Sequence, residues 1–528
     1  MTTLRTHSLF TSLSTRSQKT GTVKKLTISK IAGIVFVFCL ATAMVSPAQT
    51  FTTLVSFDGT NGSGPYLSSP VQGVDGNIYG TAGVGGVSDY CTEWGTCGTV
   101  YKITPAGALT TVYNFCSENE CVDGALPYNS MILGTNGDFY GLTTYNGPHG
   151  AGEVFKVTPA GALTVLYPFC TLAQCTDGDG PISSWLVEAT DGDFYGTTDG
   201  GGAYGYGIVF RLTPAGTLTT LYSFCSQKDY TCPDGSYPWS GLVQATNGDF
   251  YGTTRNGGAQ NAGTVFKITP AGVLTTLHTF CSLAGCADGD TPQAGLILGS
   301  DGNLYGTTSS GGANYQTCWI DETPCGTIFK ITPAGVLTTL YTFCSLNNCA
   351  DGYYPYAGLV QGTDGRFYGT VEAGGAYGYG TVFAFNENSG GTGGTLTTLY
   401  SFCTEGYPCA DGARPEGGLV QSTNGTFYGT TYEGGTSTIG TVFSVSVGLA
   451  PFVETLPTSG KVGAAVIILG NNLTGTTAVS FNGTSAKFTV VSETEIKTTV
   501  PTGATTGKIE VATPTGTLTS NAVFRVTS

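Results

Sequence analysis

The cysteines are the residues of this chain whose spacing most clearly suggests chemistry. The 528-residue sequence has 17 cysteines, and the 16 other than Cys39 fall into close pairs. The pairs are Cys91 with Cys97, Cys116 with Cys121, Cys170 with Cys175, Cys225 with Cys232, Cys281 with Cys286, Cys318 with Cys325, Cys344 with Cys349, and Cys403 with Cys409. Such pairs are suited to disulfides or to zinc, but one pair supplies only two of the four zinc ligands and no histidine recurs beside them. We therefore expect eight local disulfides, no bound metal and no cofactor.

Acidic and aromatic loop residues form a second group that could do chemistry. Carboxylates accept hydrogen bonds from hydroxyl groups and exposed rings stack on apolar faces, so together they are suited to sugar binding. The candidates are Asp199, Arg255, Glu372, Tyr432 and Glu433, with Trp94 and Trp319 inside two of the cysteine segments. We expect a ligand near the two tryptophans, because rigid disulfide-closed loops lose little entropy on binding. The alternative is that all seven are ordinary solvated loop residues.

An aspartate followed by glycine recurs after six of the cysteine pairs. These aspartates are Asp123, Asp177, Asp234, Asp288, Asp351 and Asp411, and Asp58 takes the same place in a shorter first segment. Calcium needs six or more oxygen ligands, and only Asp179 and Asp290 add a second acid nearby. A turn-capping role for the repeated aspartate is therefore the better interpretation.

These residues are carried by a repeated unit. Its core, Asp/Asn-Gly-x-apolar-Tyr-Gly, contains Tyr79, Tyr140, Tyr195, Tyr251, Tyr305, Tyr368 and Tyr428. In the unit that begins at residue 241, strands are predicted over 241–244, 250–254, 264–269 and 274–280, and Asn247-Gly248 predicts a two-residue hairpin turn with positive φ at both positions. No segment shows a sustained helical period, so helix should be almost absent.

Apolar residues on both faces of each unit favour a propeller, in which every blade is covered by two neighbours. The segment 51–57 matches the fourth strand of the unit, whereas the last unit ends after its third strand at 441–445. We expect seven four-stranded blades over residues 49–448, with the N-terminal strand completing the last blade. The second-to-third-strand loops and the crossovers to the next blade should then bring all cysteine pairs to one face, opposite a face that carries only the tight turns and the Thr-Pro-Ala-Gly corners. A basic residue recurs in the third strand, which we interpret as a strand-edge or ion-pairing residue.

Composition and the N-terminal segment indicate an exported, acidic protein. Residues 1–48 combine basic residues with an apolar run and small residues before Gln49, the pattern of a signal peptide. An uncleaved anchor is the alternative, although the run is short for a membrane span. The net charge is −15, which disfavours nucleic acid and anionic membranes as partners. We expect a secreted or cell-surface monomer without a membrane span in the mature chain.

The repeat resembles the GloVer tandem-repeat family, exported bacterial proteins described as having a choice of anchor. The resemblance covers residues 51–447 and rests on Gly-Leu-Val-Gln, Asp-Gly-x-Phe-Tyr-Gly-Thr-Thr, Gly-Thr-Val-Phe-Lys-Ile-Thr and Leu-Thr-Thr-Leu-Tyr-x-Phe. It implies export and repetition but no catalytic residue. The cysteine-free segment 449–528, with Val466–Leu473, Val479–Gly483 and Gly507–Val511, resembles an IPT/TIG domain, an immunoglobulin-like β-sandwich.

The sequence gives little support for catalysis. Its three histidines, His7, His149 and His278, form no recognisable triad with serine, cysteine or aspartate. We therefore expect a non-catalytic binding or scaffold protein for extracellular carbohydrate or protein. The alternative is a carbohydrate-active enzyme, a hydrolase or lyase, with a carboxylate pair at the mouth of the propeller channel.

Overall fold

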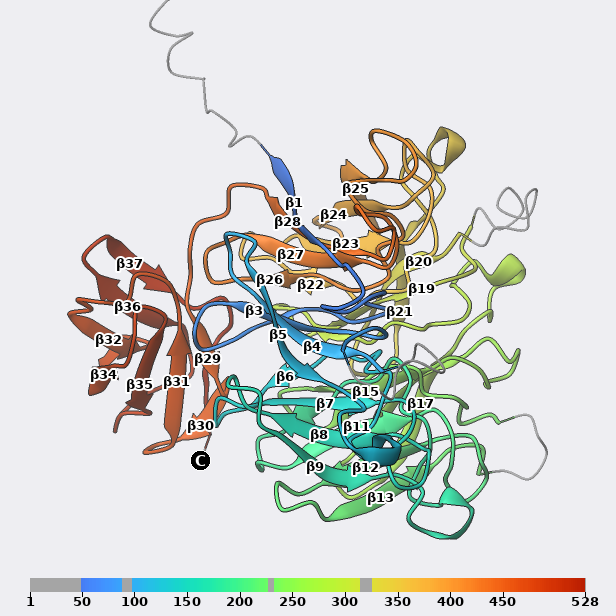
Figure 1. Ribbon diagram of the computed structural model, residues 1–528, viewed down its shortest axis with the longest axis horizontal. Helices are drawn as coiled ribbons and strands as arrows, with labels where there is room; N and C mark the ends of the chain where they lie inside the picture. Colours follow the sequence, from blue (N-terminus) through green and yellow to red (C-terminus); the bar gives the residue numbers. More distant parts are fainter. Residues whose placement is uncertain (1–48, 88–96, 227–231, 314–324, 528) are drawn as a thin grey trace, which may run out of the picture. The chain divides into compact units, whose positions relative to one another are not determined.

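The computed structural model describes residues 49–87, 97–226, 232–313 and 325–527, and this part of the chain is almost entirely β (Figure 1). Seven antiparallel four-stranded sheets follow one another, each in the order first to fourth strand. The first sheet contains β2 (Val71–Gln72), β3 (Ile78–Ala82), β4 (Thr99–Ile103) and β5 (Leu109–Asn114). The second contains β6 (Ile132–Leu133), β7 (Phe139–Thr143), β8 (Glu153–Val157) and β9 (Leu163–Pro168), and the third β10 (Val187–Glu188), β11 (Phe194–Thr198), β12 (Ile208–Leu212) and β13 (Leu218–Ser223).

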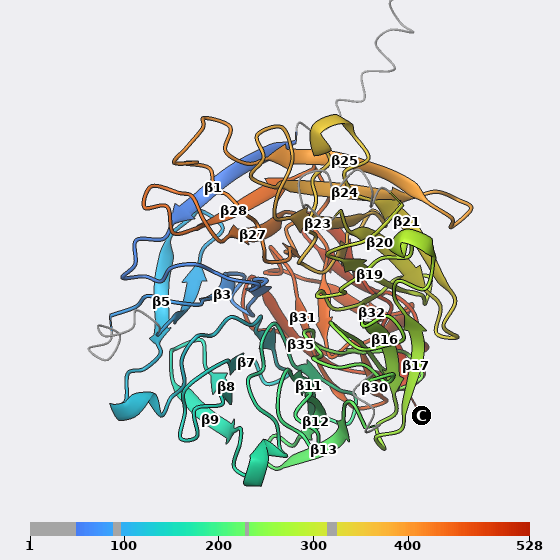
Figure 2. The same cartoon turned by 90° about the vertical axis from the view of Figure 1, so that its right-hand side faces the viewer.

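The fourth sheet contains β14 (Val243–Gln244), β15 (Phe250–Thr254), β16 (Thr264–Ile268) and β17 (Leu274–Thr279), and the fifth β18 (Ile297–Leu298), β19 (Leu304–Thr308), β20 (Thr327–Ile331) and β21 (Leu337–Thr342). The sixth contains β22 (Val360–Gln361), β23 (Phe367–Val371), β24 (Thr381–Glu387) and β25 (Gly394–Ser401). The seventh contains β26 (Val420–Gln421), β27 (Phe427–Thr431) and β28 (Thr441–Ser446), and β1 (Thr50–Ser56) completes it by pairing with β28 (Figures 1 and 2). The predicted pairing of the two ends of the repeat array is therefore confirmed.

The turn between the first two strands differs from the sequence-based expectation. At Asn247-Gly248 only the glycine has a positive φ, of 89°. The Ala245 N–H donates to the Asp249 carbonyl, and the Gly248 N–H donates to the Ala245 carbonyl. The predicted two-residue turn was wrong: the loop has three residues and ends in a left-handed glycine, a geometry that also matches the twist of antiparallel strands.

Aromatic rings join each sheet to the next. The repeated tyrosine of one sheet packs on the residue before the tyrosine of its neighbour, with ring centroids 4.1 to 4.3 Å apart in five pairs. These pairs are Tyr79 with Phe139, Tyr140 with Phe194, Tyr195 with Phe250, Tyr305 with Phe367, and Tyr368 with Phe427. Tyr251 packs in one core with Leu304, and Tyr428 packs in one core with Ile78 of the first sheet. The interpretation of these tyrosines as packing residues is confirmed.

The space between the inner ends of the sheets is filled by small residues and one tryptophan. At the matching position two residues before each inner strand, the chain has Ser69, Ser130, Trp185, Gly241, Gly295, Gly358 and Gly418. A Cβ atom built on Gly241 or Gly295 would collide with the Trp185 indole, which therefore lies directly against both glycines. The Trp185 indole therefore fills the space that a side chain at Gly241 or Gly295 would need, and it leaves no room for a ligand at these two glycines.

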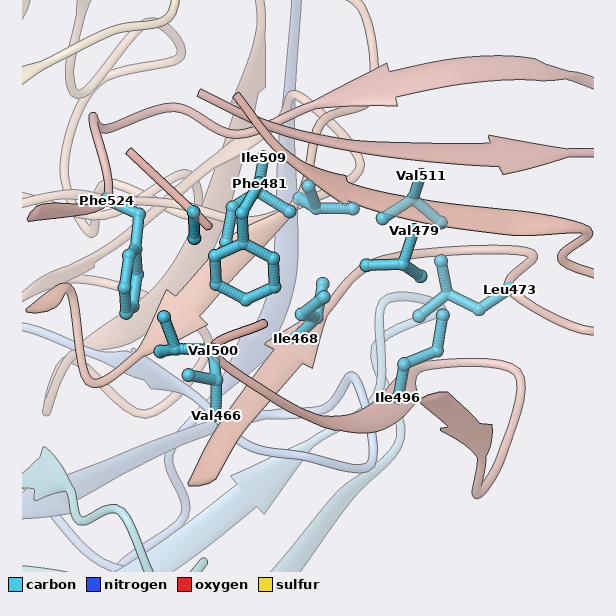
Figure 3. Packing of buried hydrophobic residues seen from close by; sticks show 12 residues of the cluster. Val466, Ile468, Leu473, Val479, Phe481, Ile496, Val500, Ile509, Val511 and Phe524 are labelled. Carbon is cyan, nitrogen blue, oxygen red and sulfur yellow. The ribbon is translucent and has the colours of Figure 1, made fainter. Parts of the chain in front are cut away.

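The described helices are single short 3-10 turns, as expected. They are η2 (Asn119–Cys121), η3 (Ala173–Cys175), η4 (Ala284–Cys286) and η6 (Asn347–Cys349). The C-terminal strands are β29 (Glu454–Leu456), β30 (Ser459–Lys461), β31 (Ala465–Leu469), β32 (Ala478–Phe481), β33 (Thr484–Ser485), β34 (Phe488–Val490), β35 (Glu495–Thr499), β36 (Ile509–Thr513), β37 (Gly516–Thr519) and β38 (Arg525–Thr527). They form two four-stranded sheets and the parallel pair β30–β38. Between these strands lies an apolar core that includes Ile468, Phe481 and Phe524 (Figure 3).

Candidate functional site

Six of the predicted disulfides lie in the crossovers between sheets. They join Cys116 to Cys121, Cys170 to Cys175, Cys225 to Cys232, Cys281 to Cys286, Cys344 to Cys349, and Cys403 to Cys409. Cys97 and Cys325 are also disulfide-bonded, but their expected partners Cys91 and Cys318 lie outside the described residues. Disulfides at this density are typical of extracellular proteins.

The repeated aspartates hold these disulfide loops in place. The Asp177 carboxylate accepts hydrogen bonds from the Thr171 backbone N–H at 2.8 Å, the Leu172 N–H at 3.2 Å and the Tyr167 hydroxyl at 2.8 Å. His278 takes the place of the tyrosine in the fourth sheet and contacts Asp288 at 3.1 Å. The turn-capping interpretation is therefore confirmed.

The crossovers and the second-to-third-strand loops meet on one face, which we call the disulfide face. Each crossover forms a bridge with the loop of the sheet that it enters, as between Asp179 and Gly200, and between Ala413 and Glu433. Most of the exposed large apolar side chains of the sheet region belong to these same segments. They include Val87, Tyr145, Leu172, Tyr204, Leu283, Leu346, Tyr377, Tyr379 and Tyr407. This face therefore combines rigid loops with accessible aromatic rings, the combination expected of a recognition surface.

A feature that the sequence-based reasoning missed places further side chains on this face. Every crossover ends in a residue-proline-residue segment, and the residue before the proline has a left-handed backbone. These residues are Gly64, Leu126, Gly180, Tyr237, Thr291, Tyr354 and Arg414, with φ between 53° and 60°. A non-glycine residue in this conformation costs about 1 kcal/mol or more, and such residues gather at functional sites. The repeated proline before each inner strand was the sequence signal for them.

Arg414 gathers three carboxylates from neighbouring segments. Its Nε donates to Glu372 Oε1 at 2.8 Å and its Nη1 donates to Glu433 Oε1 at 3.1 Å. Its Nη2 contacts both Glu372 and Glu416, the latter at 3.5 Å. The Tyr432 ring lies 6.0 Å from the guanidinium carbon. The structure thus brings together three of the predicted site residues, Glu372, Tyr432 and Glu433, around an arginine that was not predicted.

Glu416 is the most perturbed acid of this cluster. Its side chain is 3 % exposed, and its Oε2 has no hydrogen-bond partner. Burial raises the pKa of Glu416 to about 8, the negative charge of Glu372 adds to the shift, and Arg414 opposes it. Glu416 is therefore largely protonated at neutral pH.

A pocket of about 360 Å³ opens beside the Arg414 cluster on the disulfide face. Its aromatic lining consists of Tyr379, Tyr407 and Tyr432, and its charged lining residue is Glu433. Ser63 and Thr438 add polar groups. Glu372 and Glu416 do not line the pocket; both contact Arg414, which also contacts the pocket residue Glu433.

The other two predicted site residues belong to a separate group. The guanidinium carbon of Arg255 lies 4.0 Å from the centroid of the Trp239 ring. Burial raises the pKa of Asp199 to about 6, while the Trp239 side chain and the charge of Arg255 oppose the shift. Trp94 and Trp319 lie outside the described residues. The predicted set is thus divided between the Arg414 cluster and an Arg255–Trp239 stack.

On the face opposite the disulfide face, one corner is longer than expected, which corrects the expectation. In the sixth sheet β24 and β25 extend beyond the corner at which the other sheets turn, to Glu387 and from Gly394. A pocket of about 250 Å³ beside this extension is lined by Asp301, Tyr305 and Glu387, among others. Glu387 binds Lys330 and the Tyr305 hydroxyl, at 2.5 and 2.7 Å. These groups are paired with one another, so this pocket is a weaker candidate for recognition.

The recurring basic residue of the third strand is an ion-pairing residue, as predicted. In four sheets this residue lies within 4.0 Å of an aspartate that belongs to or follows the preceding turn: Lys102, Lys156, Arg211 and Lys267. In the fifth sheet Lys330 pairs with Glu387. Among the described residues no group of three or more His, Cys, Asp or Glu side chains is arranged to hold a metal ion. No helix in the described part of the chain is long and apolar enough to cross a membrane.

Comparison with known proteins gives the family. A profile described as the Gloeobacter/Verrucomicrobia repeat matches residues 18–184, 171–345 and 322–491, together more than half of the sequence. The chain belongs to this repeat family. The three matches of the Gloeobacter/Verrucomicrobia repeat confirm the predicted tandem repetition, and no curated protein shows significant sequence similarity to this chain.

Solved structures show only distant similarity to this repeat protein. A putative 6-phosphogluconolactonase from Bacteroides uniformis is 15 % identical, with 67 % of this chain and 88 % of that chain covered and a TM-score of 0.41. Kuenenia stuttgartiensis hydrazine synthase is 14 % identical, with 74 % of this chain and 96 % of that chain covered and a TM-score of 0.44. The Pseudomonas aeruginosa periplasmic gluconolactonase is 17 % identical, with 66 % of this chain and 86 % of that chain covered and a TM-score of 0.38. Similarity at this level carries no argument about function.

Proposed function

We propose that this chain is an exported extracellular or cell-surface protein that binds carbohydrate without catalysis. In this proposal residues 1–48 are a signal peptide, residues 49–448 form a seven-bladed β-propeller, and residues 449–528 form an immunoglobulin-like sandwich of the IPT/TIG type. The cyclic sequence of contacts among the seven sheets supports the propeller. The two C-terminal sheets, which share one core, support the sandwich.

The observation that carries the binding proposal is the pocket beside Arg414. Its three tyrosines, Tyr379, Tyr407 and Tyr432, offer rings for stacking on a sugar, and Glu433 offers a carboxylate for sugar hydroxyl groups. Because Arg414 fixes one oxygen of Glu433 at 3.1 Å, the acceptor is oriented before the ligand arrives. This combination of rings and one acid suits an uncharged sugar unit in the pocket.

The test is a glycan-binding screen of the mature protein and of three variants. Tyr407→Ala and Tyr432→Ala should each weaken binding about tenfold through loss of ring stacking. Tyr377→Ala is the matched control, because Tyr377 is a 50 % exposed tyrosine of the Tyr379 loop that does not line the pocket. Unchanged binding in a variant that lacks both Tyr407 and Tyr432 rings would exclude the pocket.

The predicted site at Trp94 and Trp319 belongs in the same screen. Trp94→Ala and Trp319→Ala should weaken binding if their disulfide-closed loops take part in recognition, as the sequence analysis proposes. Loss of binding in these variants with full binding in Tyr432→Ala would move the ligand away from the pocket and onto those loops.

A carbohydrate-active enzyme is the second candidate, and the Arg414 cluster contains the observation that favours it. Glu372 and Glu416 contact the same guanidinium nitrogen, so the two carboxyl groups are close together, and Glu416 keeps its proton at neutral pH as a general acid must. Against it, Glu433 is the acid of the cluster that lines the pocket. Release of reducing sugar by the wild type, abolished in Glu416→Gln, would establish the enzyme; its absence across a glycan panel would leave the binding protein.

A further inference from the structure

Arg255 differs from every other described basic residue of the seven sheets. Each of the others lies within 4.0 Å of a carboxylate oxygen: Lys102, Lys156, Arg211, Lys267, Lys330, Arg366 and Arg414. Arg255 alone among these described residues has no carboxylate within that distance. In a chain with a net charge of −15, an arginine without a counter-ion is the exception, and its charge is available to an outside anion.

The position of Arg255 keeps its charge at the surface. It follows directly after β15 on the disulfide face, and its guanidinium lies on the Trp239 ring at 4.0 Å. Both side chains are partly exposed. Stacking fixes the plane of the guanidinium while its N–H groups, which lie in that plane, stay free to donate.

The nearest acid does not neutralise this arginine. Asp199 lies close enough for the charge of Arg255 to affect its pKa, yet the two groups form no ion pair within 4.0 Å. Asp199 Oδ1 is buried and has no hydrogen-bond partner, so this oxygen accepts no hydrogen bond from Arg255.

The chemistry of a single stacked guanidinium selects a particular ligand group. Its two parallel N–H donors match two oxygens of a carboxylate or of a phosphate. A phosphate monoester carries a charge of about −1.5 to −2 at neutral pH, whereas one carboxylate carries a single charge, which one guanidinium balances. No second base stands beside Arg255 among the described residues. We infer that Arg255, stacked on Trp239, is a subsite for the carboxylate of a uronic acid unit in an extended acidic glycan. This inference rests on the proposed carbohydrate binding and names its substrate class.

The test compares a charged and an uncharged form of one glycan. The probes are oligogalacturonate and its methyl ester, which has the same rings without the negative charge, and binding to the full mature protein is measured by titration calorimetry. The wild type should bind the acid form about tenfold more tightly than the ester. Arg255→Gln should bind both forms equally, and Arg255→Lys should recover part of the preference because lysine keeps the charge but loses the fork.

Arg366→Gln is the matched control, because Arg366 is a partly exposed arginine that is already paired with Asp364, and it should keep the wild-type preference. Retention of the preference in Arg255→Gln, or no binding of oligogalacturonate by the wild type, would overturn the inference. Preferential binding of a peptide carboxylate over oligogalacturonate would also overturn it, in favour of a peptide ligand.

Failure of the proposed pocket gives a different result. Tyr407→Ala and Tyr432→Ala should weaken the acid and ester forms by the same factor, without a change in the preference. If these variants bind both forms like the wild type while Arg255→Gln loses the preference, the pocket is wrong and the carboxylate subsite stands.

Discussion

Arg414 and Arg255 lie on the same face of the molecule, but their surroundings give them opposite roles. Arg414 contacts the carboxyl groups of Glu372, Glu416 and Glu433, and the side chains of Glu372 and Glu416 are only 9 % and 3 % exposed. Its charge is therefore paired within the protein. Arg255 stacks on Trp239 and has no carboxylate within 4.0 Å among the described residues. The comparison predicts that an arginine at a variable loop position binds a ligand only where the protein leaves its charge unpaired.

The largest expected effect that separates the two arginines is on stability. Arg414→Met leaves the buried Glu372 carboxylate without its cation, so the free energy of unfolding should fall by about 3 kcal/mol. Arg255→Met breaks no ion pair and should cost less than about 1 kcal/mol. Urea unfolding of both variants at neutral pH measures the difference, and equal losses would contradict the assigned roles.

The architecture of the repeats was predictable from the sequence because it depends on patterns that recur. The strands of the fourth sheet agree with the predicted limits within one residue, apart from the inner strand, which begins two residues later than predicted, at Val243. The inner strand has only two residues in each of the seven sheets, and no local pattern marks where it begins.

The candidate site was only half predictable for the same reason. Glu372, Tyr432 and Glu433 break the repeat after the Tyr-Gly-Thr motif and were found as deviations. Arg414 belongs to a crossover 42 residues from Glu372 along the chain. Its backbone N–H donates to the Tyr379 carbonyl, in the loop that follows Glu372, and this long-range contact brings the two segments together. Long-range pairing of this kind follows from the fold and not from the composition of either segment.

The second effect concerns pH and distinguishes Glu416 from the exposed acids of the same face. The pKa of Glu416 is raised from 4.5 to about 8 in the folded protein, so the folded state keeps a proton that the unfolded state has already lost between these values. The stabilising contribution is thus complete below about pH 4.5 and is lost as the pH rises through about 8. Glu416→Gln cannot ionise and should be no more stable than the wild type near pH 5 but clearly more stable near pH 8.5. Thermal unfolding at the two pH values tests this, and a difference independent of pH would contradict it.

The smallest effect is the matching experiment at the Arg255–Trp239 stack. The pKa of Asp199 is raised from 3.8 to about 6, chiefly by burial, while Trp239 and Arg255 favour the ionised form. The folded state therefore holds the extra proton only between these two values, and the wild type loses the corresponding stability as the pH rises through about 6. This pH range is narrower than that of Glu416, so the stability gained by Asp199→Asn over the wild type should be smaller than that gained by Glu416→Gln. The gain should develop between about pH 4 and 6, whereas that of Glu416→Gln develops up to about pH 8. Thermal unfolding at pH 4, 6 and 8.5 compares the two variants directly. A gain that continues to grow above pH 7 in Asp199→Asn would contradict this prediction, because it would place the pKa of Asp199 in the folded protein well above 6.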